Sequence, residues 1–271
     1  MVEFSIIIVN YNSGNLLVNC VESIFTHVSG NVEIIVVDND SRDDSIALIN
    51  QFGKDKPLKI IRSEINLGFA KANNLGVESA SGNYYHFLNP DTLMMEGFED
   101  AYEFIREKKQ DAIYVTGLTD GDGHPQKMKH LIPTLGNYFE RLFNKNNCKY
   151  WNIGASLIID KDSFIKIGGW PEDYFMYTED LDFFYRSYKF NIPVKYIKQS
   201  VIHIGKGTSE KVWTILDREK RIELSLKTFY KKYGIYYQYP IIRTIQLMYL
   251  LIREPGNFGT ALKAALRSKT W

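Results

Sequence analysis

The sequence contains few cysteines and no long apolar run. Its two cysteines, Cys20 and Cys148, are far apart. This spacing excludes a disulfide framework or a cysteine-based zinc site, and it favours a reducing compartment. No apolar run approaches the roughly 18 residues of a membrane-spanning helix. The chain begins with a strand-like segment rather than a basic and apolar leader, so no secretory signal is expected. We therefore expect a cytoplasmic protein.

An excess of charge of one sign is also missing. The chain has 33 Lys and Arg residues against 32 Asp and Glu residues, so it is not built to attract nucleic acid. The Gly-x-Gly-x-x-Gly motif of dinucleotide oxidoreductases is absent. A sugar-1-phosphate nucleotidyltransferase would have a Gly- and Arg-rich loop after its first strand. This chain has Asn10-Tyr11-Asn12-Ser13-Gly14 there, which argues against that class.

The first 115 residues alternate between two kinds of segment. Short apolar runs rich in β-branched residues predict strands buried on both faces. They occupy residues 5–9, 33–37, 58–61 and 84–88. Helical spacing of apolar residues fills the intervals between the runs. This alternation predicts βαβ units and a mostly parallel central sheet flanked by helices.

The rest of the chain is predicted to be more helical. Residues 116–150 are irregular, with several Gly and Pro. Helices are expected over residues 179–190, 212–233, 239–253 and 258–267, with short strands at 194–197 and 201–204. We expect a catalytic domain over residues 1–235, with a nucleotide-sugar half at 1–115 and an acceptor half at 116–235. Residues 236–271 would form an amphipathic helical tail.

Polar residues follow three of the predicted strands. They are Asn10-Tyr11-Asn12, Asp38-Asn39-Asp40 and Asn89-Pro90-Asp91. Open α/β sheets bind ligands at the carboxyl ends of their strands. Three polar strand ends at one edge therefore predict a ligand site there.

These motifs, in this order, resemble those of the family 2 glycosyltransferases, which have the GT-A fold. The resemblance covers roughly residues 4–230. Besides the three strand ends, it rests on residues 66–76 (NLGFAKANNLG), 168–170 (GGW) and 175–182 (FMYTEDLD). The Asn-Pro-Asp form is most similar to the rhamnosyltransferase-like branch. That branch implies a UDP- or dTDP-linked sugar as the donor.

The resemblance assigns the first two strand ends to the base and ribose of the donor. It implies that Tyr11 packs on the base and that Asp38 accepts a hydrogen bond from the ring N–H of the base, with Asn10 and Asn12 beside them. A carboxylate only accepts hydrogen bonds, which suits an imide N–H. The alternative for Asp38 is a local turn and helix cap.

A second group of donor contacts is implied where a loop enters a helix. Asn66, Gly68, Lys71 and Asn74 lie there. The N–H groups at a helix N-terminus and a lysine suit a diphosphate. The alternative is that Gly68 only ends the loop and that Lys71 is solvated.

The third strand end is implied to hold a metal. Asp91 would ligate a divalent cation, Mg²⁺ or Mn²⁺, that neutralises charge on the leaving diphosphate. Asn89 replaces the first acid of the family's usual pair, which predicts weak cation binding in the absence of the donor. His203 lies where related enzymes often have a further ligand, although a lone histidine is more often structural. Lys206 and Ser209 follow as candidate phosphate contacts.

The Glu-Asp pair at residues 179–180 is implied to supply the catalytic base. Asp180 matches the family's base, and Glu179 is the next candidate. Nearby acids would raise the pKa of this base. One direct displacement inverts the anomeric configuration. Asp182 and Arg186 have the i,i+4 spacing of an ion pair.

Acceptor binding is less clearly marked. Trp170 and Tyr177 are candidates for stacking on acceptor sugars, and the alternative is that both are core residues. Residues 116–150 would contain the specificity loops. The tail combines apolar and basic residues, which fits an interfacial membrane helix, a dimerisation helix or a helix packed on the catalytic domain.

Two readings of function remain open. The first is an inverting glycosyltransferase of bacterial polysaccharide or glycoconjugate synthesis, acting on a glycan or a lipid-linked acceptor. The second is a catalytically degenerate GT-A domain that binds sugars or partners. Asn89 keeps the second reading open, whereas Asp38, Asp91 and Asp180 argue against it.

Overall fold

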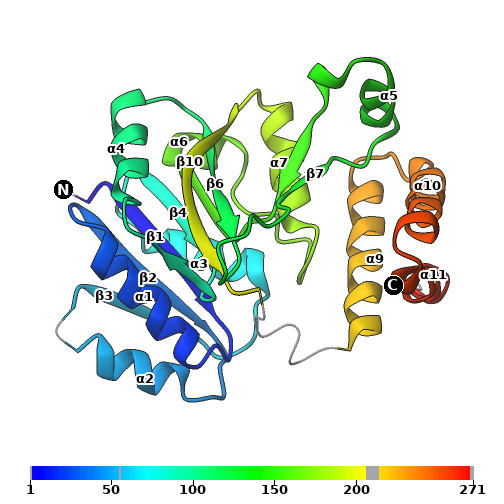
Figure 1. Ribbon diagram of the computed structural model, residues 1–271. Coiled ribbons are helices and arrows are strands. Elements are labelled where there is room, and N and C mark those ends of the chain that lie inside the picture. The colour runs from blue at the N-terminus through cyan, green and yellow to red at the C-terminus, as the bar shows by residue number, and fades with distance from the viewer. Residues whose placement is uncertain (1, 55, 206–213, 269–271) are drawn as a thin grey trace.

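A single eight-stranded sheet forms the centre of the computed structural model, which describes residues 2–54, 56–205 and 214–268 (Figure 1). The strand order is β3-β2-β1-β4-β9-β6-β10-β5. In this order the strands are β3 (Leu58–Ser63), β2 (Val32–Asn39), β1 (Phe4–Asn10), β4 (Tyr84–Leu88), β9 (Ser156–Asp160), β6 (Ile113–Thr119), β10 (Val194–His203) and β5 (Thr92–Met94). Only β9 and β5 run opposite to the rest, so the predicted mostly parallel sheet is confirmed.

Helices cover both faces of this sheet, as the continuous apolar runs predict. Alternate residues of β1 enter different cores, with Ile6 and Ile8 on one face and Ile7 on the other. The first face packs against α1 (Asn15–His27), α2 (Ser45–Phe52) and α4 (Glu99–Lys108). The second face packs against α3 (Phe69–Glu78), α6 (Lys161–Lys166) and α7 (Glu179–Lys189) (Figure 1). The predicted α/β architecture, a mostly parallel sheet flanked by helices, is thereby confirmed.

The remaining elements lie to one side of the sheet (Figure 1). They are the hairpin of β7 (Lys129–Leu131) and β8 (Tyr150–Asn152), α5 (Leu135–Phe143) with the 3₁₀ helix η1 (Lys145–Asn147), α9 (Ile215–Lys232), α10 (Gln238–Arg253) and α11 (Pro255–Arg267). The helix α5 extends from this hairpin, within a segment that the sequence marks as irregular.

Helices α9, α10 and α11 pack on one another. Phe229 and Tyr230 of α9 share a core with Ile242 of α10 and with Leu181 of α7. The predicted helix start at Val212 lies outside the described residues, as do Lys206 and Ser209. None of the helices in the described part of the chain combines the length and the apolar composition that crossing a membrane requires.

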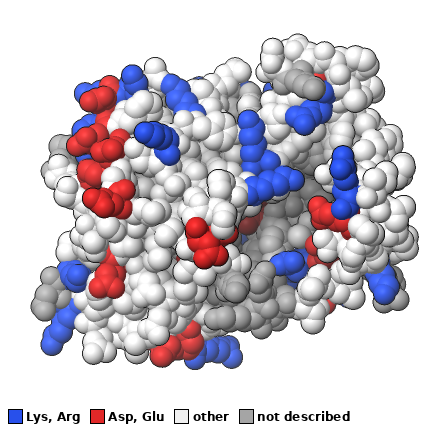
Figure 2. Space-filling model, in the orientation of Figure 1, with Lys and Arg blue, Asp and Glu red and all other residues white. Residues whose placement is uncertain are grey.

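Charge is mixed on the face shown in Figure 2. Acidic side chains crowd at its left edge, near α4, whereas basic and acidic ones both border the hollow beside the α9–α11 helices. This distribution agrees with the near-neutral composition of the chain.

Candidate active site

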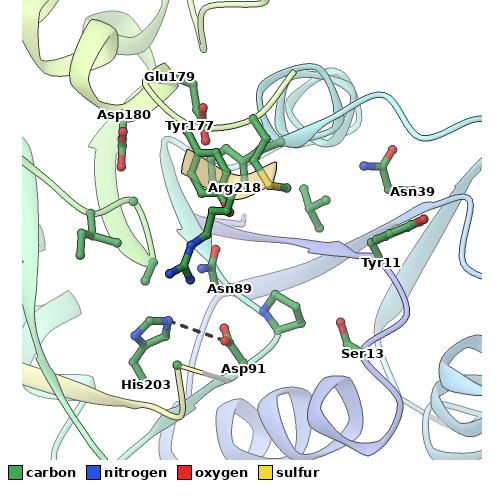
Figure 3. A pocket seen from close by; sticks show the side chains of 18 of the residues that line it. Tyr11, Ser13, Asn39, Asn89, Asp91, Tyr177, Glu179, Asp180, His203 and Arg218 are labelled. Atoms are coloured by element: carbon green, nitrogen blue, oxygen red, sulfur yellow. Dashed lines mark ion pairs between the residues drawn. The ribbon is translucent and has the colours of Figure 1, made fainter. Parts of the chain in front are cut away.

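One cleft of about 760 Å³ lies at the carboxyl ends of the sheet strands (Figure 3). Its walls come from the ends of β1, β2, β4 and β10, from the N-terminus of α7 and from the first turns of α9. The sequence-predicted residues that line it are Tyr11, Asn66, Asn89, Asp91, Tyr177, Glu179, Asp180 and His203. The fold therefore brings together residues that are distant in the sequence.

The end of β2 is connected to the loop that precedes α3. The amide of Asn39 donates to Asn66 Oδ1 at 3.0 Å, and its oxygen accepts from Leu67 N at 2.7 Å. Tyr11 lies on the same side of the cleft as Asn39 (Figure 3). The sequence motif includes Asn39, but our site prediction did not. Its side chain holds the cleft wall in place.

Asn10 and Asp38 lie side by side beneath this wall. Both are buried, and neither lines the cleft. Asn10 Nδ2 donates to Asp38 Oδ1 at 3.1 Å and to the hydroxyl groups of Ser41 and Ser45 at 2.9 Å each. Asn12 Oδ1 accepts from two backbone N–H groups, one of them that of Arg42 at 2.7 Å. In this geometry Asn10 and Asn12 shape the turns after β1 and β2 rather than face the cleft.

The four predicted donor contacts around the α3 N-terminus divide into two groups. Asn66 lines the cleft, and Gly68 lies behind it at φ +79°, where an added Cβ would be 2.1 Å from Phe175 O. Gly68 is thus required for close approach of two backbones. Lys71 is exposed and is not part of the cleft lining.

Asn74, the fourth predicted contact, is engaged elsewhere. Its amide donates to the backbone oxygen of Trp170 at 3.0 Å and accepts from the backbone N–H of the same residue at 3.0 Å. This pair of hydrogen bonds fixes α3 to the Gly-Gly-Trp segment. Asn74 therefore has a structural role here, away from the cleft.

Asp91 and His203 face each other at the lower end of the cleft in Figure 3. Strand β5 pairs with β10 so that Thr92 is opposite His203. This register places His203 Nε2 3.7 Å from Asp91 Oδ2. Burial raises the pKa of Asp91, and the charge of His203 partly offsets the rise. Asn89 lies between this pair and the centre of the cleft (Figure 3).

The orientation of the His203 ring is set by Gln126. The Gln126 amide nitrogen donates to the His203 backbone oxygen at 2.6 Å, so its oxygen faces His203 Nδ1 at 2.8 Å. An amide oxygen only accepts hydrogen bonds, so Nδ1 carries a proton. The other ring nitrogen, Nε2, then faces Asp91. Imidazole nitrogen with carboxylate and amide oxygens is a donor set that suits Mn²⁺ or Mg²⁺.

Glu179 and Asp180 lie on the opposite side of the cleft (Figure 3). Tyr177 and Thr178, just before them, have φ values of 68° and 75°, a sparsely populated conformation for residues with side chains. Such backbone strain is typical of functional sites. It turns the first residues of α7 into the cleft.

Burial raises the pKa of Asp180 to about 7, although hydrogen bonds from backbone N–H groups, including that of Leu181 at 2.8 Å, lower it. Burial and the charge of Asp180 raise the pKa of Glu179 well above its ordinary value. Glu179 Oε2 is buried and has no hydrogen-bond partner among the described residues. Asp180 therefore titrates near neutral pH, and Glu179 holds its proton more tightly than a free glutamate does.

Asp182 is buried behind this pair and anchors α7. Its carboxylate accepts from Tyr174 Oη at 2.8 Å and from Lys232 Nζ at 2.8 Å, and it also bonds Tyr233 Oη. Arg186 Nε lies 3.2 Å from Asp182, so the predicted i,i+4 ion pair is confirmed. These contacts connect α7 to α9.

Trp170 does not reach the cleft. It is 1% exposed, and its indole ring stacks on Phe183 with ring centroids 4.4 Å apart. Phe69 and Phe87 contact the same ring edge-on. No face remains for an acceptor sugar, so Trp170 belongs to the core. Tyr177 does line the cleft.

The site prediction also left out Arg218 and His130, which both line the cleft. Arg218, in the first turn of α9, extends toward Asn89, Asp91 and His203 (Figure 3). His130, in β7, lines the cleft and stacks on Trp151 at a centroid distance of 4.6 Å. The sequence shows several Lys and Arg residues along the predicted 212–233 helix. It does not indicate which of these side chains faces the site.

A separate acidic group lies outside the cleft. Oxygen and nitrogen atoms of Asp120, Asp122 and His124 are within 4.8 Å of one another. Asp120 Oδ1 accepts from the backbone N–H groups of Asp122 and His124 at 3.0 and 2.8 Å. These hydrogen bonds of the Asp120 carboxylate close an exposed turn after β6.

Comparison with known proteins agrees with this architecture. The family model described as "Glycosyl transferase family 2" matches residues 5–168, and the chain therefore belongs to this family. The glycosyltransferase GlyG of Streptococcus pneumoniae is 33% identical over 111 residues, which are 40% of this chain and 37% of GlyG. The minor teichoic acid biosynthesis protein GgaB of Bacillus subtilis is 34% identical over 113 residues, 40% of this chain and 13% of GgaB. The chain thus corresponds to well under half the length of these relatives.

Solved structures show the same fold. S. aureus TarS 1–349 superposes with a TM-score of 0.59 at 21% identity, over 83% of this chain and 65% of TarS 1–349. TarS 1–349 in complex with UDP-GlcNAc gives a TM-score of 0.59 at 16% identity, over 97% and 79% of the two chains. At this identity the similarity supports the GT-A fold.

Proposed function

We propose that this protein transfers a sugar from a nucleotide-diphosphate sugar to an acceptor hydroxyl with inversion at the anomeric carbon. The observation that carries the proposal is the arrangement of one cleft. A carboxylate–imidazole pair, Asp91 and His203, faces a second carboxyl pair, Glu179 and Asp180, in which Asp180 has a pKa of about 7. The first pair suits a diphosphate with its cation, and the second suits proton transfer at neutral pH.

The donor would lie along the strand ends. Tyr11 and Asn39 offer a ring face and an amide near the ends of β1 and β2, where the base would bind. Asp38, buried behind this wall, would reach the base only if the turn around it opened. The diphosphate would extend toward Asp91, and the guanidinium of Arg218 points to the same place (Figure 3).

Asp91, Asn89 and His203 Nε2 would hold a divalent cation. When bound, that cation neutralises the charge that builds on the diphosphate as it leaves. Arg218 would add a fixed positive charge beside the same oxygens.

Asp180 would act on the acceptor. It takes the proton of the acceptor hydroxyl while that oxygen forms a bond to the anomeric carbon. The bond from this carbon to the diphosphate breaks in the same step, and the nucleoside diphosphate leaves with the electron pair. Glu179, whose raised pKa favours its protonated form, would donate a hydrogen bond to a sugar oxygen.

Several features support a role in bacterial surface-glycan synthesis. The relative GgaB is named for minor teichoic acid biosynthesis, and TarS was solved with UDP-GlcNAc. The UDP-GlcNAc complex of TarS supports a UDP-linked donor, and the resemblance to the rhamnosyltransferase-like branch adds a dTDP-linked donor as the second candidate. Thermal shift with a panel of UDP- and dTDP-sugars, in Mn²⁺ and in EDTA, tests the donor class. Release of nucleoside diphosphate tests turnover, and the absence of both binding and turnover with every donor would leave the sugar-binding module as the function.

A further inference from the structure

We propose that the apolar surface formed by α5 and α10 docks this protein on an anionic lipid surface. We call this surface the α5–α10 face. It consists of exposed apolar side chains of the two helices, namely Phe139, Leu142, Phe143, Ile241, Ile245, Met248, Tyr249 and Ile252. The docking is argued from the surface alone. Its purpose, access to lipid-linked acceptors, rests on the proposed function.

The apolar residues of each helix follow helical spacing. On α10, Ile241, Ile245, Met248 and Ile252 recur at i, i+4, i+7 and i+11, which places them on one side of the helix. Ile242, about a quarter of a turn from this stripe, is buried against α9. Helix α10 is thus packed on one side and apolar on the other. Membrane-surface helices have this pattern.

The helix α5 extends this surface. Its inner residues Leu135 and Tyr138 pack into the core shared with α9 and α10, and Leu135 N donates to Gln238 Oε1 at 2.9 Å. Its outer residues remain exposed, and Phe143 is 84% exposed. The two helices are neighbours (Figure 1), and each carries exposed apolar residues beside its packed ones. Patches of this kind mark interaction sites.

Charge identifies the occupant. Residues 135–149 and 238–267 contain seven basic and two acidic residues, whereas the whole chain is nearly neutral. The basic residues are Arg141, Lys145, Lys149, Arg243, Arg253, Lys263 and Arg267, and the acidic ones are Glu140 and Glu254. Arg243 pairs with the buried carboxylate of Glu223. Arg141, Arg253 and Lys263 are exposed and contribute to the positive charge of this part of the surface. Basic residues around an apolar helix are attracted to anionic lipid headgroups. A second copy of this chain would bring the same positive excess and be repelled.

The position of the cleft fits this occupant. Helix α9 lines the cleft with Arg218, Glu219 and Ile222, and it packs against α10 through Phe229 and Tyr230. The α5–α10 face is therefore separated from the cleft by α9 and α10, roughly 20 Å at an interaxial distance of 8–10 Å per packed pair. An acceptor carried on a lipid headgroup could span this distance.

Flotation of the full chain with vesicles tests the proposal. Vesicles of phosphatidylcholine and phosphatidylglycerol are compared with phosphatidylcholine alone, at low and high salt. We expect binding to the anionic vesicles that weakens with salt. Phe143→Ser with Met248→Ser should reduce this binding at least about tenfold, because both side chains leave the apolar face. Ile165→Ser is the matched control, because Ile165 on α6 is 63% exposed and lies outside the face.

Each outcome has a defined meaning. Equal flotation of the double variant and the control, or no flotation of the unaltered chain, overturns the proposal. A dimer in sedimentation that the double variant converts to a monomer, without vesicle binding, assigns the face to a second copy and also overturns it. Thermal shift by UDP-sugars is measured on all variants, so a failure of the proposed function is seen separately from a failure of docking.

Discussion

His203 Nε2 lies 3.7 Å from Asp91 Oδ2 across the antiparallel pair of β5 and β10. The distance is longer than a hydrogen bond, so the two groups interact through charge and leave both atoms facing the cleft. Because Asn89 beside them is neutral, the site carries a single fixed negative charge. Cation binding in the absence of nucleotide is expected to be weak.

Asp91→Ala is therefore expected to abolish the metal-dependent part of nucleotide binding. Titration calorimetry with Mn²⁺ alone measures cation binding. A second titration with a nucleoside diphosphate in Mn²⁺ measures the metal-dependent part of nucleotide binding. Asp162→Ala is the control, because Asp162 is an exposed acid on α6, outside the cleft. Tight Mn²⁺ binding without nucleotide would contradict the role assigned to Asn89. Metal dependence that survives in Asp91→Ala would remove Asp91 from the site.

Gln126→Leu is expected to lower the affinity of the same site for Mn²⁺, although Gln126 is not one of the proposed ligands. Loss of the acceptor at His203 Nδ1 frees the ring to rotate and to change its tautomer. Groups that orient a metal-binding histidine typically affect metal affinity by about 10–100-fold. The readout is the Mn²⁺ concentration needed for half-maximal nucleotide binding. Gln126→Glu, which keeps an acceptor, should restore much of the affinity, and equal losses in both variants would point to a purely structural role.

Arg218→Ala tests whether α9 contributes to donor binding. A charge-assisted hydrogen bond contributes about 1.5–3 kcal/mol, so the Kd for a nucleoside diphosphate should rise by about ten- to a hundredfold. The Kd for the nucleoside alone should be unchanged, because it lacks the phosphates. Lys220→Ala is the control, since Lys220 is on the same helix and pairs with Asp217 at 3.8 Å. Equal effects on nucleoside and diphosphate would exclude a phosphate contact.

Asp182→Asn is expected to cost stability rather than chemistry. Asp182 is buried and bonded by Tyr174, Arg186 and Lys232. Removing one partner of a buried charge network costs about 3–5 kcal/mol in the free energy of unfolding. Urea denaturation measures it. Asp173→Asn, which breaks only a half-exposed contact to Lys232, should cost about 1 kcal/mol or less.

The fold was readable because strand positions depend on local apolar runs. The runs at residues 5–9 and 33–37 could be placed as buried strands, and their polar ends were therefore known to meet at one edge. The direction of β9 was not readable, because an apolar run has no polarity along the chain. Its place between β4 and β6 is decided by long-range pairing.

The site could be predicted from the sequence only in part, because the direction of a side chain depends on how the helices and strands pack together. Asp91, Glu179 and Asp180 were found through motifs whose backbone turns them into the cleft. Trp170 was assigned wrongly, since its burial depends on how α3 and α7 pack around it. Arg218 was missed, because its position follows from the docking of α9 on α7.

The sharpest test concerns Asp180, whose pKa is raised to about 7 by burial. As a base it must be ionised, so turnover should fall about tenfold per pH unit below pH 7. Asp180→Asn should lower turnover by about 10²–10⁴-fold with little change in donor affinity. Asp162→Asn, an exposed acid on α6, is the control. Near-normal transfer in Asp180→Asn with loss in Glu179→Gln would move the base to Glu179.

Stability provides an independent check on the same residue. The folded-state pKa of Asp180 lies above the value of about 3.9 in an unfolded chain, so ionisation costs folding free energy. The stability of the unaltered protein should therefore decline as pH rises from about 4 to 7, through this group. Asp180→Asn removes that cost, so its melting temperature should exceed that of the unaltered protein at pH 8. The two should converge near pH 4, where both side chains are neutral. A variant that is inactive and also destabilised at pH 8 would mean that the substitution had damaged the fold, and the loss of turnover could not then be attributed to the missing base.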